Sequence, residues 1–174
     1  MWYIVYRAKT STTELTKELD RAGVEHYIPT QLVERLNEDG TEMVEVEEVA
    51  IRNLVFLRTD QGLYSVVDRI AGLRAPFMDT MTGKPAEVGD ADMNRFIAIL
   101  KVHPSGIKLL HDPYAKFADR PMVRVKAGLF EGMEGRVVRV LRDRKLVLAV
   151  GQMAIAVSGI HRSLLEYVEE SNEK

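Results

Sequence analysis

The sequence predicts an α+β protein in two parts, an antiparallel sheet flanked by helices and then a small all-β unit. Three observations predict this class. Strand-like and helix-like runs alternate over the first hundred residues, and an Asp39-Gly40 pair among them favours an antiparallel hairpin. Only short β-like runs follow residue 121. The hydrophobic fraction of 46% and charged fraction of 29% are those of a globular protein.

The chain is predicted to begin with a strand and a helix. Residues Trp2 to Tyr6 are β-branched or aromatic, which favours a strand. The stretch "STTELTKELDRAGV" predicts a helix, because Ser11, Thr12 or Thr13 can cap its start and Gly23 can end it.

A second strand and an acidic hairpin arm are predicted next. "EHYIPTQLVERL" reads as a strand, in which Pro29 marks an edge or a bend. The Asp39-Gly40 turn then leads into a strand that contains Met43, Val44, Val46 and Val49. The segment from Glu34 to Glu48 contains seven acidic residues and only one arginine. Nothing nearby supplies the burial that tunes a carboxylate for catalysis, so we expect a solvated arm.

The rest of the first part is predicted to be a strand and two helices. "AIRNLVFLRTD" is its most apolar run, which favours a central strand. "GLYSVVDRIAGL" places Leu63, Val66, Val67 and Ile70 at helical spacing. In "TGKPAEVGDADMNRFIAIL" a turn precedes a short helix that Asp90 can cap. We therefore predict one domain over residues 1–101.

A linker and a small barrel are predicted to follow. Prolines and a glycine interrupt the stretch "KVHPSGIKLLHDPYAKFADRP", and its apolar residues show neither helical nor strand periodicity. Residues 102–119 are therefore predicted as a linker. Five short β-like runs occupy residues 120–170, namely "MVRV", "GRVVRVL", "KLVLAV", "QMAIAV" and "LLEYV". Their spacing suits a small barrel, whose closure would remove exposed strand edges.

The stretch "VRVKAGLFEGMEGRVVRV" contains three closely spaced glycines. We expect Gly128 to form the turn after the first of these strands. Gly132 and Gly135 should frame a loop, because glycine tolerates positive φ and presents no Cβ to a neighbouring strand. The glycines therefore favour a tight, SH3-like barrel.

This glycine-rich stretch resembles the KOW motif of NusG-type transcription factors and several ribosomal proteins. "WYIVYR", the helix, "VEHYIPTQLVER" and "IRNLVFLRTD" are similar, in this order, to the NGN domain of the NusG family. "GKPAEVGDADMNRF" resembles the closing segment of that domain, so the resemblance spans nearly the whole chain. "IRNLVFL" stands where the general factor has an aromatic-Pro-Gly-Tyr sequence. This departure and the acidic arm make the chain similar to specialised UpxY-type antiterminators of polysaccharide operons.

The resemblance implies a factor that binds the clamp coiled coil of bacterial RNA polymerase and promotes processive elongation or antitermination. The positions that match the polymerase-binding hollow are Tyr6, Ile51, Leu54, Phe56 and Phe77. Each could instead be a core residue; for Phe56 the core is the stronger explanation, and for Ile51 the two are even. Tyr64 and Ser65 fall near the side that faces non-template DNA in the family.

For the barrel, the resemblance implies recruitment of a ribosomal protein, a termination factor or nascent RNA. Phe130 and Val150 match partner-facing positions. Residues 120–150 contain eight Lys or Arg and three acidic residues. This local excess of positive charge could contact phosphate. The candidates are Arg124, Lys126, Arg136 and Arg139, and an ordinary solvated surface is the alternative for each of them.

The sequence argues against catalysis. It has no cysteine, its four histidines lack metal-ligand spacing, and neither a phosphate-binding P-loop nor a serine elbow is present. We therefore expect no enzyme activity, catalytic residue, cofactor, metal or small-molecule substrate. No signal sequence or membrane-length apolar run occurs, so we expect a cytoplasmic protein with no membrane partner.

A KOW-type ribosome- or RNA-associated protein outside transcription is the alternative function. Ribosomal proteins usually carry strongly basic tails, whereas this chain has a net charge of -2 and an acidic end, "LEYVEESNEK". Bulk attraction to nucleic acid is therefore not expected, and any such contact needs a local basic patch.

Overall fold

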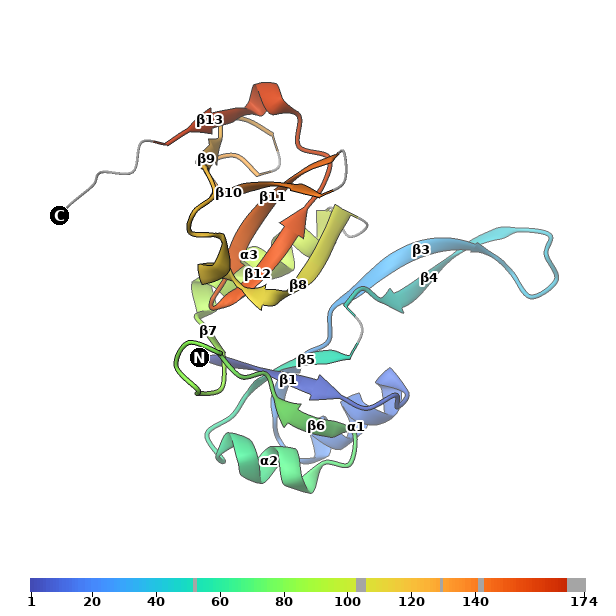
Figure 1. Ribbon diagram of the computed structural model, residues 1–174. Coiled ribbons are helices and arrows are strands. Elements are labelled where there is room, and N and C mark those ends of the chain that lie inside the picture. The colour runs from blue at the N-terminus through green and yellow to red at the C-terminus, as the bar shows by residue number, and fades with distance from the viewer. Residues whose placement is uncertain (52, 103–105, 129, 141–142, 169–174) are drawn as a thin grey trace. The chain divides into compact units, whose positions relative to one another are not determined.

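The computed structural model describes residues 1–51, 53–102, 106–128, 130–140 and 143–168 (Figure 1). The chain divides into two compact units, Met1–Ser105 and Gly106–Lys174. Each unit has its own sheet, and each is described by itself.

The first unit is built on an antiparallel sheet with the strand order β2-β5-β1-β6, and β7 also pairs with β1. Its strands are β1 (Trp2–Arg7), β2 (Glu25–Tyr27), β5 (Leu54–Arg58), β6 (Leu73–Pro76) and β7 (Glu87–Val88). The predicted α+β class is confirmed, and the apolar run around Phe56 is an interior strand, as expected. Both faces of β5 are buried, which explains its continuous apolar sequence.

Three helices cover the two faces of this sheet: α1 (Thr12–Arg21), α2 (Leu63–Arg69) and α3 (Asp90–Val102). Apolar residues of α1 and α2 share one core cluster with Val5, Val55 and Leu57 of the sheet. On the other face α3 contributes Phe96, whose ring centroid lies 5.3 Å from that of Phe56. The sheet is therefore a buried layer between helices.

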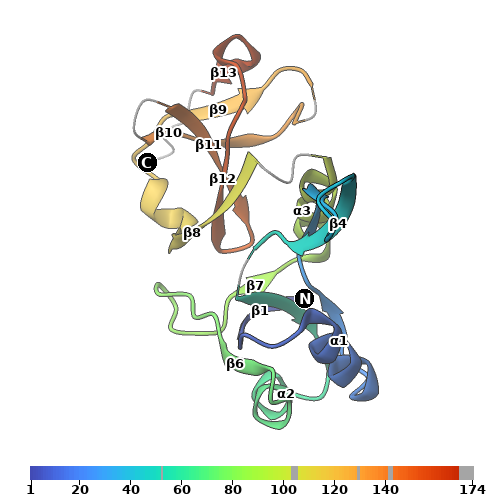
Figure 2. The same ribbon diagram turned by 90° about the vertical axis from the view of Figure 1, so that its right-hand side faces the viewer.

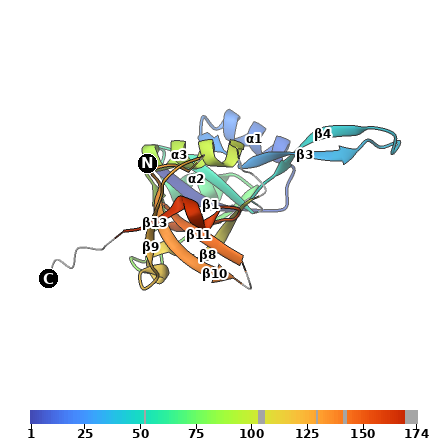
Figure 3. The same cartoon turned by 90° about the horizontal axis from the view of Figure 1, so that it is seen from above.

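The predicted second strand is two strands in different sheets. Pro29 separates β2 from β3 (Thr30–Leu36), and among the described strands β3 pairs with β4 (Met43–Val49) alone, in a two-stranded arm. Proline has no N–H to donate to a ladder, so the strand breaks there. The Pro29 carbonyl instead accepts from the Ala50 N–H at 2.8 Å, which closes the base of the arm. The arm projects away from the sheet of its unit (Figures 1 and 3).

The second unit contains a six-stranded antiparallel sheet with the order β13-β9-β10-β11-β12-β8 (Figure 2). Its strands are β8 (Ile107–Pro113), β9 (Met122–Val125), β10 (Glu134–Val140), β11 (Asp143–Val150), β12 (Met153–Val157) and β13 (Leu165–Tyr167). The five predicted strands are β9 to β13. Among the described strands no pairing joins β8 to β13, so the predicted closed barrel is not observed.

The predicted linker over residues 102–119 is mostly ordered structure. It contains β8, which pairs with β12, and the 3-10 helix η2 (Tyr114–Phe117). Ile107 lies opposite Val157 in this pairing and is buried. An edge strand needs one partner only and can end at a proline, so Pro113 did not prevent a strand here.

Two of the three KOW-like glycines adopt turn conformations, and the third lies in a strand. Gly128 has φ +88° and Gly132 has φ +79°, where an L side chain is strained. Gly135 lies one residue into β10, and a Cβ there would sit 2.5 Å from the Val147 carbonyl oxygen. This third glycine allows β10 to approach β11 closely.

Candidate interaction surfaces

Strands β1 and β5 bring most of the predicted polymerase-binding residues together. Tyr6 lies directly opposite Leu54, and Ile4 lies opposite Phe56, so all four share one face of the sheet. The Phe77 ring lies beside the Tyr6 ring, with centroids 5.6 Å apart and planes inclined at 39°. This geometry suits an aromatic pair.

Burial divides these residues into two groups. Tyr6 is 37% exposed, whereas Ile51, Leu54, Phe56 and Phe77 are at most 7% exposed. Phe56 contacts the rings of both Tyr27 and Phe96 and has no accessible surface. Ile51, Leu54, Phe56 and Phe77 are therefore buried in this structure, whereas Tyr6 presents accessible surface, and polymerase contact at all five positions stays a prediction.

The chain around Tyr6 is held by polar contacts. The buried guanidinium of Arg7 donates to the Thr10 carbonyl at 2.7 Å and to the Thr12 hydroxyl at 3.2 Å. Burial lowers the pKa of Arg7. The Arg7 N–H donates to the carbonyl of Asn53, at 2.8 Å, and Asn53 itself has φ +66°. These contacts fix the ends of β1 and β5 beside Tyr6, although no motif in the sequence indicated a role for Arg7.

A hydrogen-bonded turn with exposed methionines follows Phe77. The Asp79 carboxylate accepts from the Thr82 hydroxyl at 2.7 Å and from the Met81 N–H at 2.9 Å. These hydrogen bonds stabilise the ionised form and lower the pKa of Asp79. Met78 and Met81 are exposed in the same turn, at 39% and 74%. No motif in the sequence indicated a role for either methionine.

The predicted partner-facing residues of the second unit are interior. Phe130 is 7% exposed and Val150 is 3% exposed. Val150 lies opposite Met153 at the β11–β12 turn, where both side chains are buried. Phe130 lies in the turn between β9 and β10, and both side chains are buried in this structure, so partner contact at these two positions stays a prediction.

The predicted phosphate-binding residues differ in how they are engaged. The Arg124 Nε donates to Glu134 across the β9–β10 pair at 2.9 Å. The Arg136 Nη1 donates to the Arg120 carbonyl at 2.8 Å. Lys126 and Arg139 are exposed, and phosphate contact at these positions stays a prediction. A further basic residue of this region, Arg142, lies outside the described residues.

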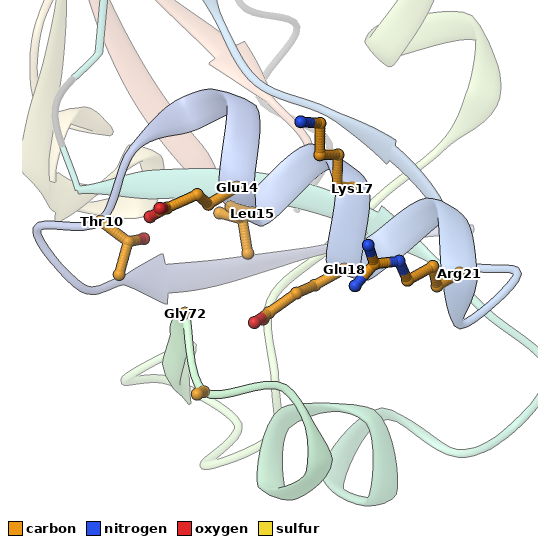
Figure 4. A pocket seen from close by; sticks show the side chains of 8 residues that line it. Thr10, Glu14, Leu15, Lys17, Glu18, Arg21 and Gly72 are labelled. Carbon is orange, nitrogen blue, oxygen red and sulfur yellow. The ribbon is translucent and has the colours of Figure 1, made fainter.

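A hollow of about 420 Å³ lies beside α1 (Figure 4). Charges of both signs alternate along its rim, where Glu14 and Glu18 project beside Lys17 and Arg21. Such a mixed rim selects neither an anion nor a cation. Among the described residues no group of three acidic or histidine side chains is placed to hold a metal ion. In the same residues no helix is both long and apolar enough to span a membrane.

The hairpin arm exposes apolar side chains that were not predicted to form a surface. Leu32, Leu36 and Met43 are each more than half exposed. A signal was present, because apolar residues occupy both odd and even positions of "TQLVERL" and "MVEVEEV". A two-stranded ribbon outside a core cannot bury both sets.

Comparisons with known proteins gave a structural likeness only. No protein-family model matches the chain, and no curated protein does either. A solved structure of Thermotoga maritima NusG, described as showing domain interaction, superposes with a TM-score of 0.45 and 20% sequence identity. The superposition covers 97% of each chain. A similarity at this level does not assign the chain to a family.

Proposed function

We propose that this protein is a transcription factor of the NusG type, which binds bacterial RNA polymerase through its first unit and promotes processive elongation or antitermination. The observation that carries the proposal is the exposure of the Tyr6 side chain at the end of β1. This aromatic side chain is 37% exposed, lies against Phe77, and occupies the position at which the sequence resemblance expects the polymerase clamp.

The surroundings of Tyr6 support a binding role. The side chain stands at the end of β1 on a buried layer that includes Leu54 and Phe56, and Arg7 fixes the chain that follows it. An aromatic anchor held in place before binding loses little conformational entropy when a partner packs against it. Aromatic residues of this kind supply much of the affinity at protein interfaces.

The second unit is proposed to recruit a further component, which would be a ribosomal protein, a termination factor or nascent RNA. Because Phe130 and Val150 are buried, exposed basic residues such as Lys126 and Arg139 are the better candidates for contact. The acidic arm and the "IRNLVFL" sequence support a specialised, UpxY-like role. This role needs no catalytic group, and it places the protein with the polymerase in the cytoplasm.

The test is binding of the full chain to purified bacterial core RNA polymerase. Tyr6→Ala should weaken binding by at least about tenfold, or ~1.4 kcal/mol. Tyr167→Ala is the matched control, because Tyr167 is also an exposed strand tyrosine but lies in β13. Fluorescence of Trp2, the single tryptophan, checks that the first unit of each variant still folds.

No binding of the wild-type chain to the polymerase would overturn the proposal. If both substitutions weaken polymerase binding equally, Tyr6 does not mark the binding surface. Co-sedimentation with ribosomal subunits in place of polymerase would instead support the KOW-type ribonucleoprotein alternative.

A further inference from the structure

One face of the hairpin arm combines exposed apolar side chains with carboxylates. The β3–β4 register and the alternation of side chains place eight residues on this face. We call it the acidic–apolar face, and its residues are Thr30, Leu32, Glu34, Leu36, Met43, Glu45, Glu47 and Val49.

The apolar members of this face are strongly exposed. Leu32 is 62% exposed, Leu36 is 61% exposed and Met43 is 58% exposed. Leu36 and Met43 lie directly opposite each other, so their exposed side chains adjoin. Clustered apolar exposure of this kind marks protein interaction sites in soluble proteins.

The charges on the same face are not balanced within the arm. Glu34 lies directly opposite Glu45, an arrangement of like charges that destabilises a strand pair. The arm's one arginine, Arg35, is on the other face and pairs there with Glu48. Seven carboxylates and one arginine give residues 30–49 a formal charge of -6, compared with -2 for the whole chain.

The acidic–apolar face continues into a hollow at the base of the arm. This hollow has a volume of about 270 Å³ and lies between β3 and the end of α3. Its apolar lining residues are Leu32 and Leu100, which is 1% exposed, and Thr30, Gln31, Glu47 and Lys101 complete the lining. The face therefore offers both a hollow with two leucines in its lining and a row of carboxylates beside it.

We propose that the acidic–apolar face binds a basic amphipathic segment of a partner protein, one that presents aliphatic side chains flanked by lysines or arginines. The aliphatic side chains would cover Leu32, Leu36 and Met43 and reach the hollow above Leu100. The basic side chains would meet Glu34, Glu45 and Glu47 and relieve their mutual repulsion. This interaction is separate from the contact proposed for Tyr6.

Charge complementarity selects this occupant over two others. A nucleic acid would place phosphates against a segment of charge -6, which repels them. The same face of a second copy would place carboxylates against carboxylates. Only a cationic partner with an apolar side matches both features of the face, in the way that a groove receives an amphipathic helix.

The proposal is tested by titrating the full chain, with ¹³C-labelled methyl groups, with a designed helical peptide of about 16 leucines and lysines in amphipathic order. Methyl signals of Leu32, Leu36, Met43 and Leu100 should shift. Raising the salt from about 0.05 to about 0.5 M should weaken binding roughly tenfold, since exposed charges are screened. A leucine–glutamate peptide of the same pattern should not bind.

Variants separate the apolar and charged contributions. The triple change L32S/L36S/M43S should weaken binding of the basic peptide by more than about tenfold. Met81→Ser is the matched control, because Met81 is an exposed methionine of the first unit outside the arm. Glu45→Gln, which leaves the apolar pairs intact, tests the charge alone and should weaken binding severalfold.

The proposal is overturned if the shifts map outside the arm, if the acidic peptide binds as well as the basic one, or if neither Glu45→Gln nor the triple variant weakens binding. Amide signals of β3 and β4 show whether the arm of each variant is folded. If the triple variant loses its arm, Glu45→Gln alone decides. None of these results bears on polymerase binding through Tyr6.

Discussion

Two consecutive strands, β4 and β5, both contain several apolar residues but place them in opposite environments. Four of the five residues of β5 are buried, whereas Met43, Val44 and Val46 of β4 are 58%, 38% and 39% exposed. The difference lies in their neighbours, because β5 runs between β1 and β2, whereas β4 pairs with β3 alone among the strands that the structure describes. Apolar side chains in β5 stabilise the fold, whereas those in β4 form an exposed surface.

The largest expected effect is a core deletion in β5. Phe56→Ala removes a fully buried ring that contacts Phe96 and Tyr27 and should lower the free energy of unfolding by about 3–5 kcal/mol. Leu32→Ala in the arm should change it by less than about 0.5 kcal/mol. Urea unfolding followed by Trp2 fluorescence measures both. Similar losses for the two variants would contradict the contrast between arm and sheet.

A second comparison places a methyl group in a tight site and in an open one. Gly135→Ala drives a Cβ against the Val147 carbonyl, so β10 must shift from β11, at a cost of about 1–3 kcal/mol. Gly40→Ala at the arm's tip has free space and meets only backbone strain at φ +68°, about 1 kcal/mol. Amide exchange in β10 and β3 reports each effect locally. A larger loss at Gly40 would reverse the expected order.

A smaller effect should depend on pH through Asp79. Its pKa is lower in the folded chain than the ordinary 3.8, because Thr82 and Met81 donate to the ionised carboxylate. The unfolded chain therefore binds its proton more readily, and stability from this group is present above pH 3.8 and lost as the pH falls through the lower folded pKa. Asp79→Asn should reduce the loss of unfolding free energy as the pH falls below 3.8, measured by urea unfolding at several pH values. An unchanged pH dependence would mean that other groups cause it.

The smallest expected effect is a gain in the arm. Glu45→Lys converts the like-charge pair with Glu34 into an opposite pair and should stabilise the arm by about 0.2–1 kcal/mol. Amide hydrogen exchange in β3 and β4 measures the change, which should shrink at high salt. Glu38→Lys, in the turn outside the β3–β4 register, is the control. Equal gains from both would point to net charge as the cause.

Local sequence signals were sufficient for much of the fold. Helix α1 begins one residue after Ser11, whose side chain makes no capping hydrogen bond, and Gly23 follows the end of the helix with φ +65°, as expected of a residue that ends a helix. The hairpin formed around Gly40, whose φ is +68°. The α+β class and the interior position of the Phe56 strand also followed from sequence. These features depend on backbone preferences and on side-chain patterns within a few residues, so they can be read along the chain.

The candidate site was only partly readable in this way. The resemblance grouped Tyr6, Ile51, Leu54, Phe56 and Phe77. Strand pairing and a ring contact bring all of these except Ile51 together in the structure, which leaves Tyr6 as the member with substantial exposure. Phe130 and Val150 were expected to face a partner and are buried. Exposure depends on which distant elements cover a residue, and no local pattern records that.

The sequence by itself determined where strands, helices and tight turns form. The tertiary structure decided what each strand meets. It paired β8 with β12, although these strands are far apart in the chain and β8 lay in a predicted linker. It also left β3 and β4 without a covering layer, so Leu32, Leu36 and Met43 are exposed while similar side chains in β5 are buried. Burial is a property of contacts between distant segments, which residue type and spacing alone do not fix.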